Sequence, residues 1–471
     1  MSSSLLSQCL VPMDNGDMEL LLDVKPTGSI SDFVEALDNC TQRISAVHVH
    51  RIFMKELKAE EQAAIFDCFH NLNEISISFV TIPMALVAKV ILRSQQLQKI
   101  SLDRVVLISD PSNAQDDVFF SALQGLDSLE DFHFALSTTG TAPEGQKLSF
   151  QADHELDTLF QSLSGIQALK KVFVSVGPNT VGRANVRPQT LEALLSNASV
   201  EDLALVNFPL HTQHCQAIVE AGSQLESLSL LNAECGNDGA TVLANALQQH
   251  EETQLTNLRK LCLPGNNITN AGGARLAKAL TTGQSKLEVL DLHANQLTKA
   301  FGSDLAALLE QNTSLRFLDV SNNKLGDKGV QAIATALRNH NTTLEQLNLF
   351  DTQLTNASCH AFAGALRNNT TLKKLNLYNN TKIDATGVQT LASALEFHNY
   401  TLERLEVTKK SVRGVDESGL DLFLKLNRDF KRGTMLASNL NEVEYVEGMA
   451  AAKNDVSSIF YFLQAKPSLC C

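Results

Sequence analysis

Six copies of one leucine pattern occupy the C-terminal half of this 471-residue chain. Each copy follows L-x-x-L-x-L, with valine in the last position of two copies, and most continue to an asparagine in position 9, as in LRFLDVSNNKL. The copies start at Leu258, Leu287, Leu315, Leu344, Leu372 and Leu402, in steps of 29, 28, 29, 28 and 30 residues. A fixed period of this length indicates a stack of similar structural units.

Each repeat is predicted to hold one strand and one helix. The leucines alternate as the buried residues of a strand do. In the second half of one repeat, Val330, Ile333 and Leu337 have the spacing of one helix face. Strands and helices in alternation predict an α/β fold with a parallel sheet on one side and helices on the other. Because helices are wider than strands, we expect the sheet on the concave face.

The repeats resemble those of a known family. The pattern LxxLxLxxN, with a step of 28 or 29 residues, is similar to the ribonuclease-inhibitor-like leucine-rich repeats, which also occur in NOD-like receptors and in the Ran GTPase-activating protein. The asparagine position holds Asn266, Asn295, Asn323 and Asn380, whereas Thr352 replaces it in one repeat. The resemblance covers about residues 258–407 and implies a horseshoe-shaped, non-catalytic binding scaffold.

Weaker copies of the L-x-x-L-x-L frame precede residue 258. They start at Ile44, Leu72, Leu97, Leu129, Leu169, Val200 and Leu225. We therefore expect an N-terminal cap over residues 1–43, a leucine-rich repeat solenoid over 44–407 (irregular repeats in 44–257, regular repeats in 258–407) and a helical C-terminal cap over 408–471, because the open ends of such a stack need covering. The alternative is a separate α/β domain before residue 200.

Polar residues and glycines recur at the starts of the predicted helices. Plausible N-caps are Asn270, Asp327 and Asn356. The glycines Gly272, Gly329 and Gly387 follow at equivalent places. We expect them there because a missing side chain allows neighbouring elements to pack closely.

Composition excludes several classes of function. The net charge is 38 − 52 = −14, which disfavours nucleic-acid binding. No apolar run is long enough to span a bilayer, and the N-terminus does not resemble a signal peptide. The nine cysteines form no CxxC pair, which predicts a reduced, cytoplasmic protein. The terminal Cys470 and Cys471 are similar to the doubly prenylated end of Rab-type GTPases, but we expect an unmodified pair.

We find no catalytic, cofactor or metal motif in the sequence. The stretch GTAPEGQK, residues 140–147, lacks the GK[ST] ending of a phosphate-binding loop. His211 and His214 share a helix face, with Cys215 next to them, but no second ligand cluster accompanies them. We therefore predict no enzyme activity, no cofactor and no metal site.

The candidate binding site lies at repeat positions 3, 5 and 7, which face the concave side. Phe350 and Tyr378 occupy position 7 of neighbouring repeats. The predicted partner-binding residues are Phe350, Tyr378, Phe317, His293, Asp291 and Asp319. Aromatic side chains with a polar border are typical of protein-binding surfaces. The alternatives are that single exposed apolar residues are normal, or that the C-terminal tail covers these rings.

These observations favour a scaffold that binds another protein, whose identity the sequence does not give. The alternative, implied by the Ran-type resemblance, is a regulator of a small GTPase. Against it, residues 409–471 lack the acidic tail typical of that family, since they hold nine Lys/Arg and eight Asp/Glu. Accelerated GTP hydrolysis by a small GTPase would discriminate the two. An enzyme with an unrecognised site has no positive support.

Overall fold

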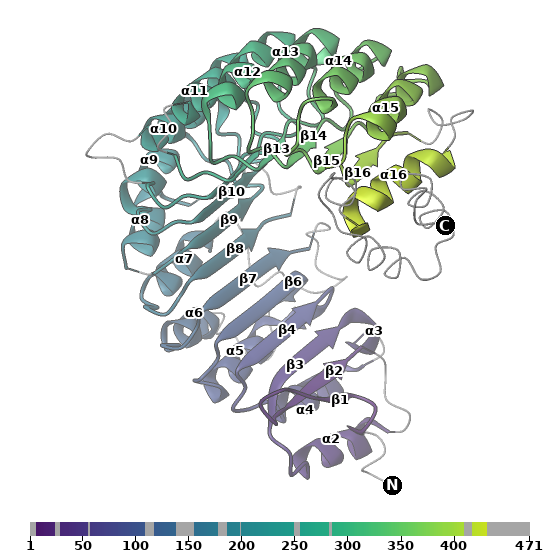
Figure 1. The fold of residues 1–471 in the computed structure, drawn as a ribbon. Helices are drawn as coiled ribbons and strands as arrows, with labels where there is room; N and C mark the ends of the chain where they lie inside the picture. Colours follow the sequence, from purple (N-terminus) through teal and green to yellow (C-terminus); the bar gives the residue numbers. More distant parts are fainter. Residues whose placement is uncertain are drawn as a thin grey trace, which may run out of the picture. The chain divides into compact units, whose positions relative to one another are not determined.

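The fold is described from a computed structural model. It covers residues 6–23, 29–54, 57–108, 117–137, 155–177, 186–197, 199–248, 255–281, 285–408 and 417–430. The chain forms two compact units, Met1–Glu234 and Cys235–Cys471. We call them the N-terminal unit and the C-terminal unit, and each is described by itself (Figure 1).

The N-terminal unit is built around a sheet that is parallel except at its start. Its strands are β1 (Leu10–Pro12), β2 (Met18–Leu22), β3 (Ile44–His50), β4 (Glu74–Ser78), β5 (Thr81–Pro83), β6 (Lys99–Ile108), β7 (Asp131–Leu136), β8 (Lys171–Ser175), β9 (Asp202–Val206) and β10 (Ser227–Leu231). The pair β1 and β2 is antiparallel, and every later pairing is parallel. Each irregular leucine copy contains one of the strands β3, β4 and β6 to β10.

Helices connect these strands. They are α2 (Ile30–Asp38), α3 (Arg51–Met54), α4 (Ala59–Asp67), α5 (Met84–Arg93), α6 (Asp117–Gln124), α7 (Leu156–Ser164), α8 (Pro188–Asn197) and α9 (Thr212–Ala221). Figure 1 shows α5 to α9 along one side of the sheet. The core between the layers is apolar, as the fully buried Ile77, Leu102 and Phe134 illustrate. The boundaries predicted for the cap and the irregular repeats remain predictions.

The C-terminal unit contains the regular repeats. Its strands are β11 (Lys260–Cys262), β12 (Val289–Asp291), β13 (Phe317–Asp319), β14 (Gln346–Asn348), β15 (Lys374–Asn376) and β16 (Arg404–Glu406). They pair in chain order, all parallel. The helices are α10 (Gly236–Leu247), α11 (Asn270–Leu280), η2 (Lys299–Phe301), α12 (Gly302–Gln311), α13 (Gly326–Asn339), α14 (Asn356–Leu366), α15 (Ala385–Phe397) and α16 (Glu417–Phe430). Figure 1 shows α10 to α15 on one side of this unit's sheet, which confirms the predicted two-layer solenoid.

Leucines of equivalent positions form a buried column in this unit. Leu318 pairs in register with Leu347, and Leu347 pairs with Leu375. Their exposed fractions are 0%, 2% and 0%. The register read from the sequence is therefore confirmed.

The asparagine at position 9, where a repeat has one, binds the turn that follows its strand, as Asn323 shows. The Nδ2 group of Asn323 donates to the carbonyl oxygens of Leu292 (3.0 Å), Val320 (3.1 Å) and Ser321 (3.1 Å). Its Oδ1 atom accepts from the backbone N–H of Leu297 in the preceding repeat, at 3.0 Å. These bonds explain why a buried polar residue recurs at this position.

The predicted N-caps were wrong by one or two residues. Thr269 caps α11 and Thr355 caps α14 through their own hydroxyl groups, and Leu325 precedes α13. The expected residues bind the next repeat instead. The carboxylate of Asp327, for example, accepts from the backbone N–H of Thr355 (2.9 Å) and the hydroxyl of Ser358 (2.5 Å). Because the repeats are stacked, a side chain at one helix start can cap the helix of the following repeat.

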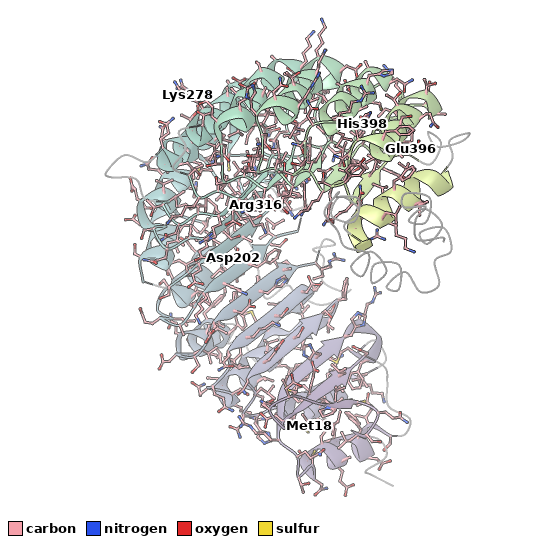
Figure 2. The ribbon with its side chains drawn as sticks, viewed as in Figure 1. Met18, Asp202, Lys278, Arg316, Glu396 and His398 are labelled. Carbon is pink, nitrogen blue, oxygen red and sulfur yellow. The ribbon has the colours of Figure 1, made fainter. Side chains whose placement is uncertain are left out.

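Exposed charged residues lie on the helix side of the C-terminal unit, among them Lys278 of α11 and Glu396 of α15 (Figure 2). Helix α16 packs against α15 and β16. The other helices predicted for the tail, and Cys470 with Cys471, lie outside the described residues. No helix in the described part of the chain is long and apolar enough to cross a membrane.

Candidate functional site

Repeat positions 3, 5 and 7 form three rows on the sheet face of the C-terminal unit that points away from its helices. We call this surface the open face. The row at position 3 pairs Val289 with Phe317, and then continues through Gln346, Lys374 and Arg404. The row at position 5 runs through Cys262, Asp291, Asp319, Asn348, Asn376 and Glu406. Side chains of one row therefore lie on adjacent strands, about 4.8 Å apart.

The side chains at position 5 hold the backbone at position 7. The carboxylate of Asp291 accepts from the backbone N–H of His293 at 2.9 Å, and Asn348 Oδ1 accepts from that of Phe350 at 3.1 Å. Asn376 binds Tyr378 in the same way, at 2.9 Å. The row of short Asp and Asn residues therefore fixes the direction in which the position-7 side chains leave the sheet.

The two aromatic rings at position 7 lie together. The rings of Phe350 and Tyr378 have centroids 5.9 Å apart and planes 9° from parallel. Tyr378 is 40% exposed. Phe350 is partly buried rather than fully exposed, because Tyr378 lies beside it. The structure therefore brings together the two rings that the sequence placed on neighbouring strands.

A hollow of about 250 Å³ lies on the same face, over β13 to β16. Its lining includes Phe317, Asn348, Lys374, Arg404 and Glu406. Phe317 belongs to position 3 and faces this hollow, so it does not join the stacked pair. The hollow was missed in the sequence. The sequence does contain a sign of the hollow. Position 3 holds a phenylalanine in β13 but long basic side chains in β15 and β16.

Charge changes along the open face. Asp291 and Asp319 stand at β12 and β13, whereas Lys374 stands at β15 and Arg404 of β16 is paired through Nε with Glu406 Oε1 at 2.6 Å. Asp319 is only 7% exposed, and Ser321 and Asn348 bind its carboxylate at 2.6 Å each. Its burial raises the pKa of that carboxyl above the ordinary value, and the charge of Asp291 adds to this effect. Asp319 is therefore mainly a residue that orders its own loop, and its predicted contact with a partner stays a prediction.

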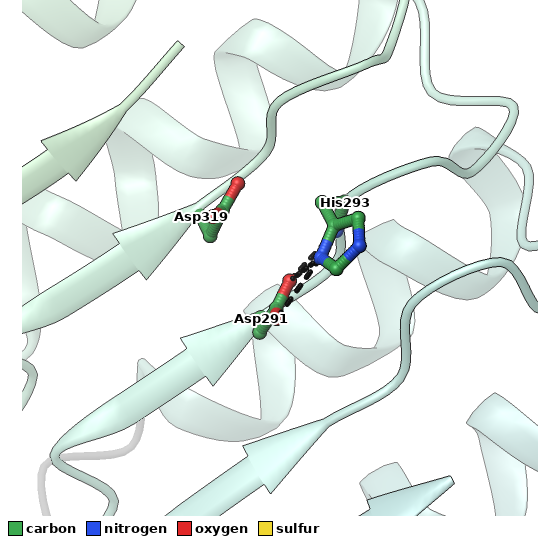
Figure 3. Close-up of side chains that lie close together, drawn as sticks. All are labelled: Asp291, His293 and Asp319. Carbon is green, nitrogen blue, oxygen red and sulfur yellow. Dashed lines mark hydrogen bonds and ion pairs between the residues drawn. The ribbon is translucent and has the colours of Figure 1, made fainter. Parts of the chain in front are cut away.

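His293 completes the acidic end of the open face. Its Nδ1 atom lies 2.8 Å and 3.0 Å from the two carboxylate oxygens of Asp291 (Figure 3). The hydrogen bond to Asp291 raises the pKa of this imidazole, and the charge of Asp319 acts in the same direction, against the opposing effect of burial. The sequence placed these residues near one another only as parts of a protein-binding surface. It gave no reason to read the three as one ligand set, because Asp319 lies in the next repeat.

The histidines of HTQHC have a structural role. His214 is buried, and its Nε2 atom lies 2.7 Å from the carbonyl oxygen of Val186. Its Nδ1 atom accepts from the backbone N–H of His211 at 3.1 Å, which caps the start of α9. These contacts account for both ring nitrogens of His214.

Comparison with known proteins gives matches to repeat proteins. The family model described as Leucine Rich repeat matches residues 311–334, 340–363 and 368–392. Ribonuclease inhibitor of Sus scrofa is 27% identical over 317 residues, which are 61% of this chain and 69% of that protein. "NACHT, LRR and PYD domains-containing protein 3" of Bos taurus is 30% identical over 159 residues, which are 30% of this chain and only 15% of that protein.

Among solved structures, a chain in the crystal structure of the yeast Rad7 and Elc1 complex is similar. The TM-score is 0.46 and the identity 16%, over 82% of this chain and 86% of that chain. The sequence matches, together with the alternating strands and helices of the regular repeats, show that the chain carries leucine-rich repeats and is similar to ribonuclease inhibitor.

Proposed function

We propose that this chain is a non-catalytic scaffold that binds another protein on the open face of its C-terminal unit. The observation that carries the proposal is the stacked pair Phe350 and Tyr378, whose neighbours in the position-5 row of the open face are the polar Asn348 and Asn376. Leucine-rich repeat proteins commonly bind protein partners, and the similarity to ribonuclease inhibitor supports the same use here. Cytoplasmic localisation remains part of this proposal.

The two rings have the properties of an interface anchor. Burying such a ring fully is worth roughly 1.5–3 kcal/mol by area. The backbone N–H groups of Phe350 and Tyr378 donate to Asn348 and Asn376, so the backbone that carries both rings is ordered before a partner arrives. An anchor that is already ordered loses little conformational entropy on binding. The pair should therefore supply much of the binding free energy.

Charged residues at both ends of the open face would select the partner. A matching surface would present basic groups toward Asp291 and acidic groups toward Lys374, with an apolar patch between them. Arg404 already pairs with Glu406. Opposite charges across an interface increase the rate of association and fix the orientation of the partner. Regulation of a small GTPase rests on the family resemblance alone, and GTP hydrolysis would be measured only if the partner is such a protein.

The test compares proteins captured from the cells that express this chain. The bait is the full chain, the variant Phe350→Ala, or the control variant Phe397→Ala. Phe397 lies at the end of α15 and is 62% exposed, so it is a phenylalanine on the other layer of the same unit. We expect one partner to be retained by the full chain and by Phe397→Ala, and to be lost with Phe350→Ala.

The captured partner is then titrated against each purified variant. Phe350→Ala should weaken its affinity at least tenfold, because central aromatic anchors commonly cost 2 kcal/mol or more when truncated. Thermal unfolding of the free variants shows whether Phe350→Ala is still folded. Equal affinity for both variants would reject the open face as the binding site, even if a partner is found.

A further inference from the structure

Three ligand-type side chains meet at the acidic end of the open face. Asp291 ends β12, Asp319 ends β13, and the two are paired in register. His293 follows Asp291 by two residues and turns its imidazole back toward it (Figure 3). One ligand atom from each of the three residues lies within 4.8 Å of the others. The group combines an imidazole nitrogen with carboxylate oxygens from two strands.

This group is short of positive charge. In the part of the chain that the structure describes, the carboxylates of Asp291 and Asp319 form no ion pair with Lys or Arg. Asp319 is nonetheless 7% exposed, so water solvates its charge poorly. Buried carboxylates of this kind are normally paired or bind a metal. His293 alone, when protonated, supplies one positive charge for two carboxylates.

The carboxylates are also held in place by neighbouring groups. Oδ1 of Asp319 accepts from the backbone N–H of Ser321 (2.9 Å) and from its hydroxyl (2.6 Å). Oδ2 of Asp319 accepts from Asn348 Nδ2 at 2.6 Å, which leaves acceptor capacity on this oxygen. Such outer hydrogen bonds are what orients carboxylate ligands in metal sites.

We propose that Asp291, His293 and Asp319 bind one divalent transition-metal ion, with Zn²⁺ the best fit. The ion takes the place of the proton between His293 Nδ1 and Asp291, and that proton leaves to solvent. Mixed imidazole and carboxylate ligands suit Zn²⁺, whereas Mg²⁺ and Ca²⁺ prefer oxygen alone. Three protein ligands leave one position for water or for a donor atom from another molecule. The proposal does not rest on the proposed function, because the ion binds the free chain.

Equilibrium dialysis of the full chain against Zn²⁺ tests this site. We expect one ion per chain, and affinity at least tenfold weaker in His293→Gln. The matched control is His360→Gln, because His360 is exposed on α14 and outside the cluster, and its affinity should equal that of the parent chain. Asp291→Asn provides a second ligand variant. Acidification should weaken binding in the parent chain, because the proton and the ion compete for His293 Nδ1.

The chain contains nine cysteines, so zinc bound to sulfur must be distinguished. Substitution with Co²⁺ does so, because thiolate ligands add a sulfur-to-metal charge-transfer absorption and the proposed ligands do not. X-ray absorption of the zinc-loaded parent chain should show nitrogen and oxygen neighbours, and this measurement needs no variant to fold. No zinc uptake, equal uptake by His293→Gln, or sulfur ligands would each overturn the proposal. Loss of the protein partner in the capture experiment would leave these results unchanged.

Discussion

Leu347 lies at the centre of the buried leucine column, between Leu318 and Leu375. Truncation to alanine leaves a cavity that the stacked repeats cannot close, so Leu347→Ala should lower the free energy of unfolding by about 2–5 kcal/mol. Denaturant unfolding measures the change. The neighbouring Gln346→Ala removes a side chain from the open face, and it should cost far less. Similar losses from both variants would mean that the column does not carry the stability.

The interaction of His293 with Asp291 should make stability depend on pH. The pKa of His293 is raised in the folded chain, so its contribution is fully present below its ordinary value of about 6.5 and is lost as pH rises through the folded value. Because the imidazole is partly exposed, we expect less than about 1 kcal/mol. Unfolding of the parent chain and of His293→Gln in metal-free buffer, at about pH 5.5 and about pH 8.5, measures it. A difference that grows with pH would contradict the assignment.

The sequence predicted the positions of individual side chains but not their hydrogen-bond partners. The period of the repeats placed Phe350 and Tyr378 on neighbouring strands, and the structure confirms the contact. It could not show that Asn348 and Asp319 bind their own loops, because those bonds depend on backbone geometry after the strand. The same limit hid the cluster of Asp291, His293 and Asp319.

The first turn of a helix packs closely against the preceding repeat. Gly272, in the first turn of α11, has its backbone N–H bound to Asn237 Oδ1 at 3.0 Å. A Cβ atom at Gly272 would lie 2.7 Å from that oxygen and 3.0 Å from Ile268 Cγ2. Gly272→Ala should therefore cost roughly 1–3 kcal/mol of stability.

Gly364 provides the matched control, because it lies within α14 and a Cβ atom there would meet nothing within 4 Å. Gly364→Ala should stabilise the chain by about 0.5–1 kcal/mol, since alanine favours the helix more than glycine does. Thermal unfolding compares the two variants. Stabilisation by both substitutions would show that Gly272 is not needed for close packing.

The repeat that starts at Leu344 holds Thr352 where most of the regular repeats have an asparagine. Thr352 is fully buried, and its hydroxyl donates to the carbonyl of Leu349 at 2.8 Å. In the repeat that follows, Asn380 additionally accepts from Thr352 N and Leu354 N. Thr352→Asn should add bonds of this kind to the preceding repeat and stabilise the chain by about 0.5–1.5 kcal/mol. Thermal unfolding of the variant and of the parent chain measures the change. A lower midpoint temperature for Thr352→Asn would show that an asparagine cannot form these additional hydrogen bonds at this position.

Elements were predicted best where the period is strict. The strands β11 to β16 fall at the expected leucine frames, because six repeats in register leave little freedom. The predicted N-caps were one residue too late in α11 and α14, because Thr269 and Thr355, rather than the asparagines that follow them, cap these helices. Stacking then uses Asn270 and Asn356 between repeats. A reading of one repeat alone cannot foresee a bond to the next.

For the whole molecule, the sequence predicts one solenoid over 44–407, and this remains a proposal beside the alternative of a separate domain before residue 200. Nearest-neighbour coupling in a solenoid transmits a destabilised repeat along the stack and weakens with distance. In the Leu347→Ala variant, hydrogen exchange should therefore accelerate strongly at β13, less at β10 and least at β3. A separate N-terminal domain would leave exchange in β3 to β6 unchanged while the other strands lose protection.

The net charge of this chain is −14, so the whole chain, and not only the binding site, attracts a basic partner. If the proposed partner presents basic groups to Asp291, the rate of association in metal-free buffer, where Asp291 keeps its charge, should fall as salt rises. Exposed charges are screened over about 8–10 Å at physiological ionic strength. The rate of dissociation should change little with salt, since the Phe350 and Tyr378 contacts are apolar. Stopped-flow mixing at low and high salt separates the two rates.

The substitution Phe350→Ala should act on the other rate than salt does. We expect this variant to dissociate faster than the parent chain and to associate at a nearly unchanged rate. A salt effect confined to dissociation would place the charged contacts inside the interface rather than at its border.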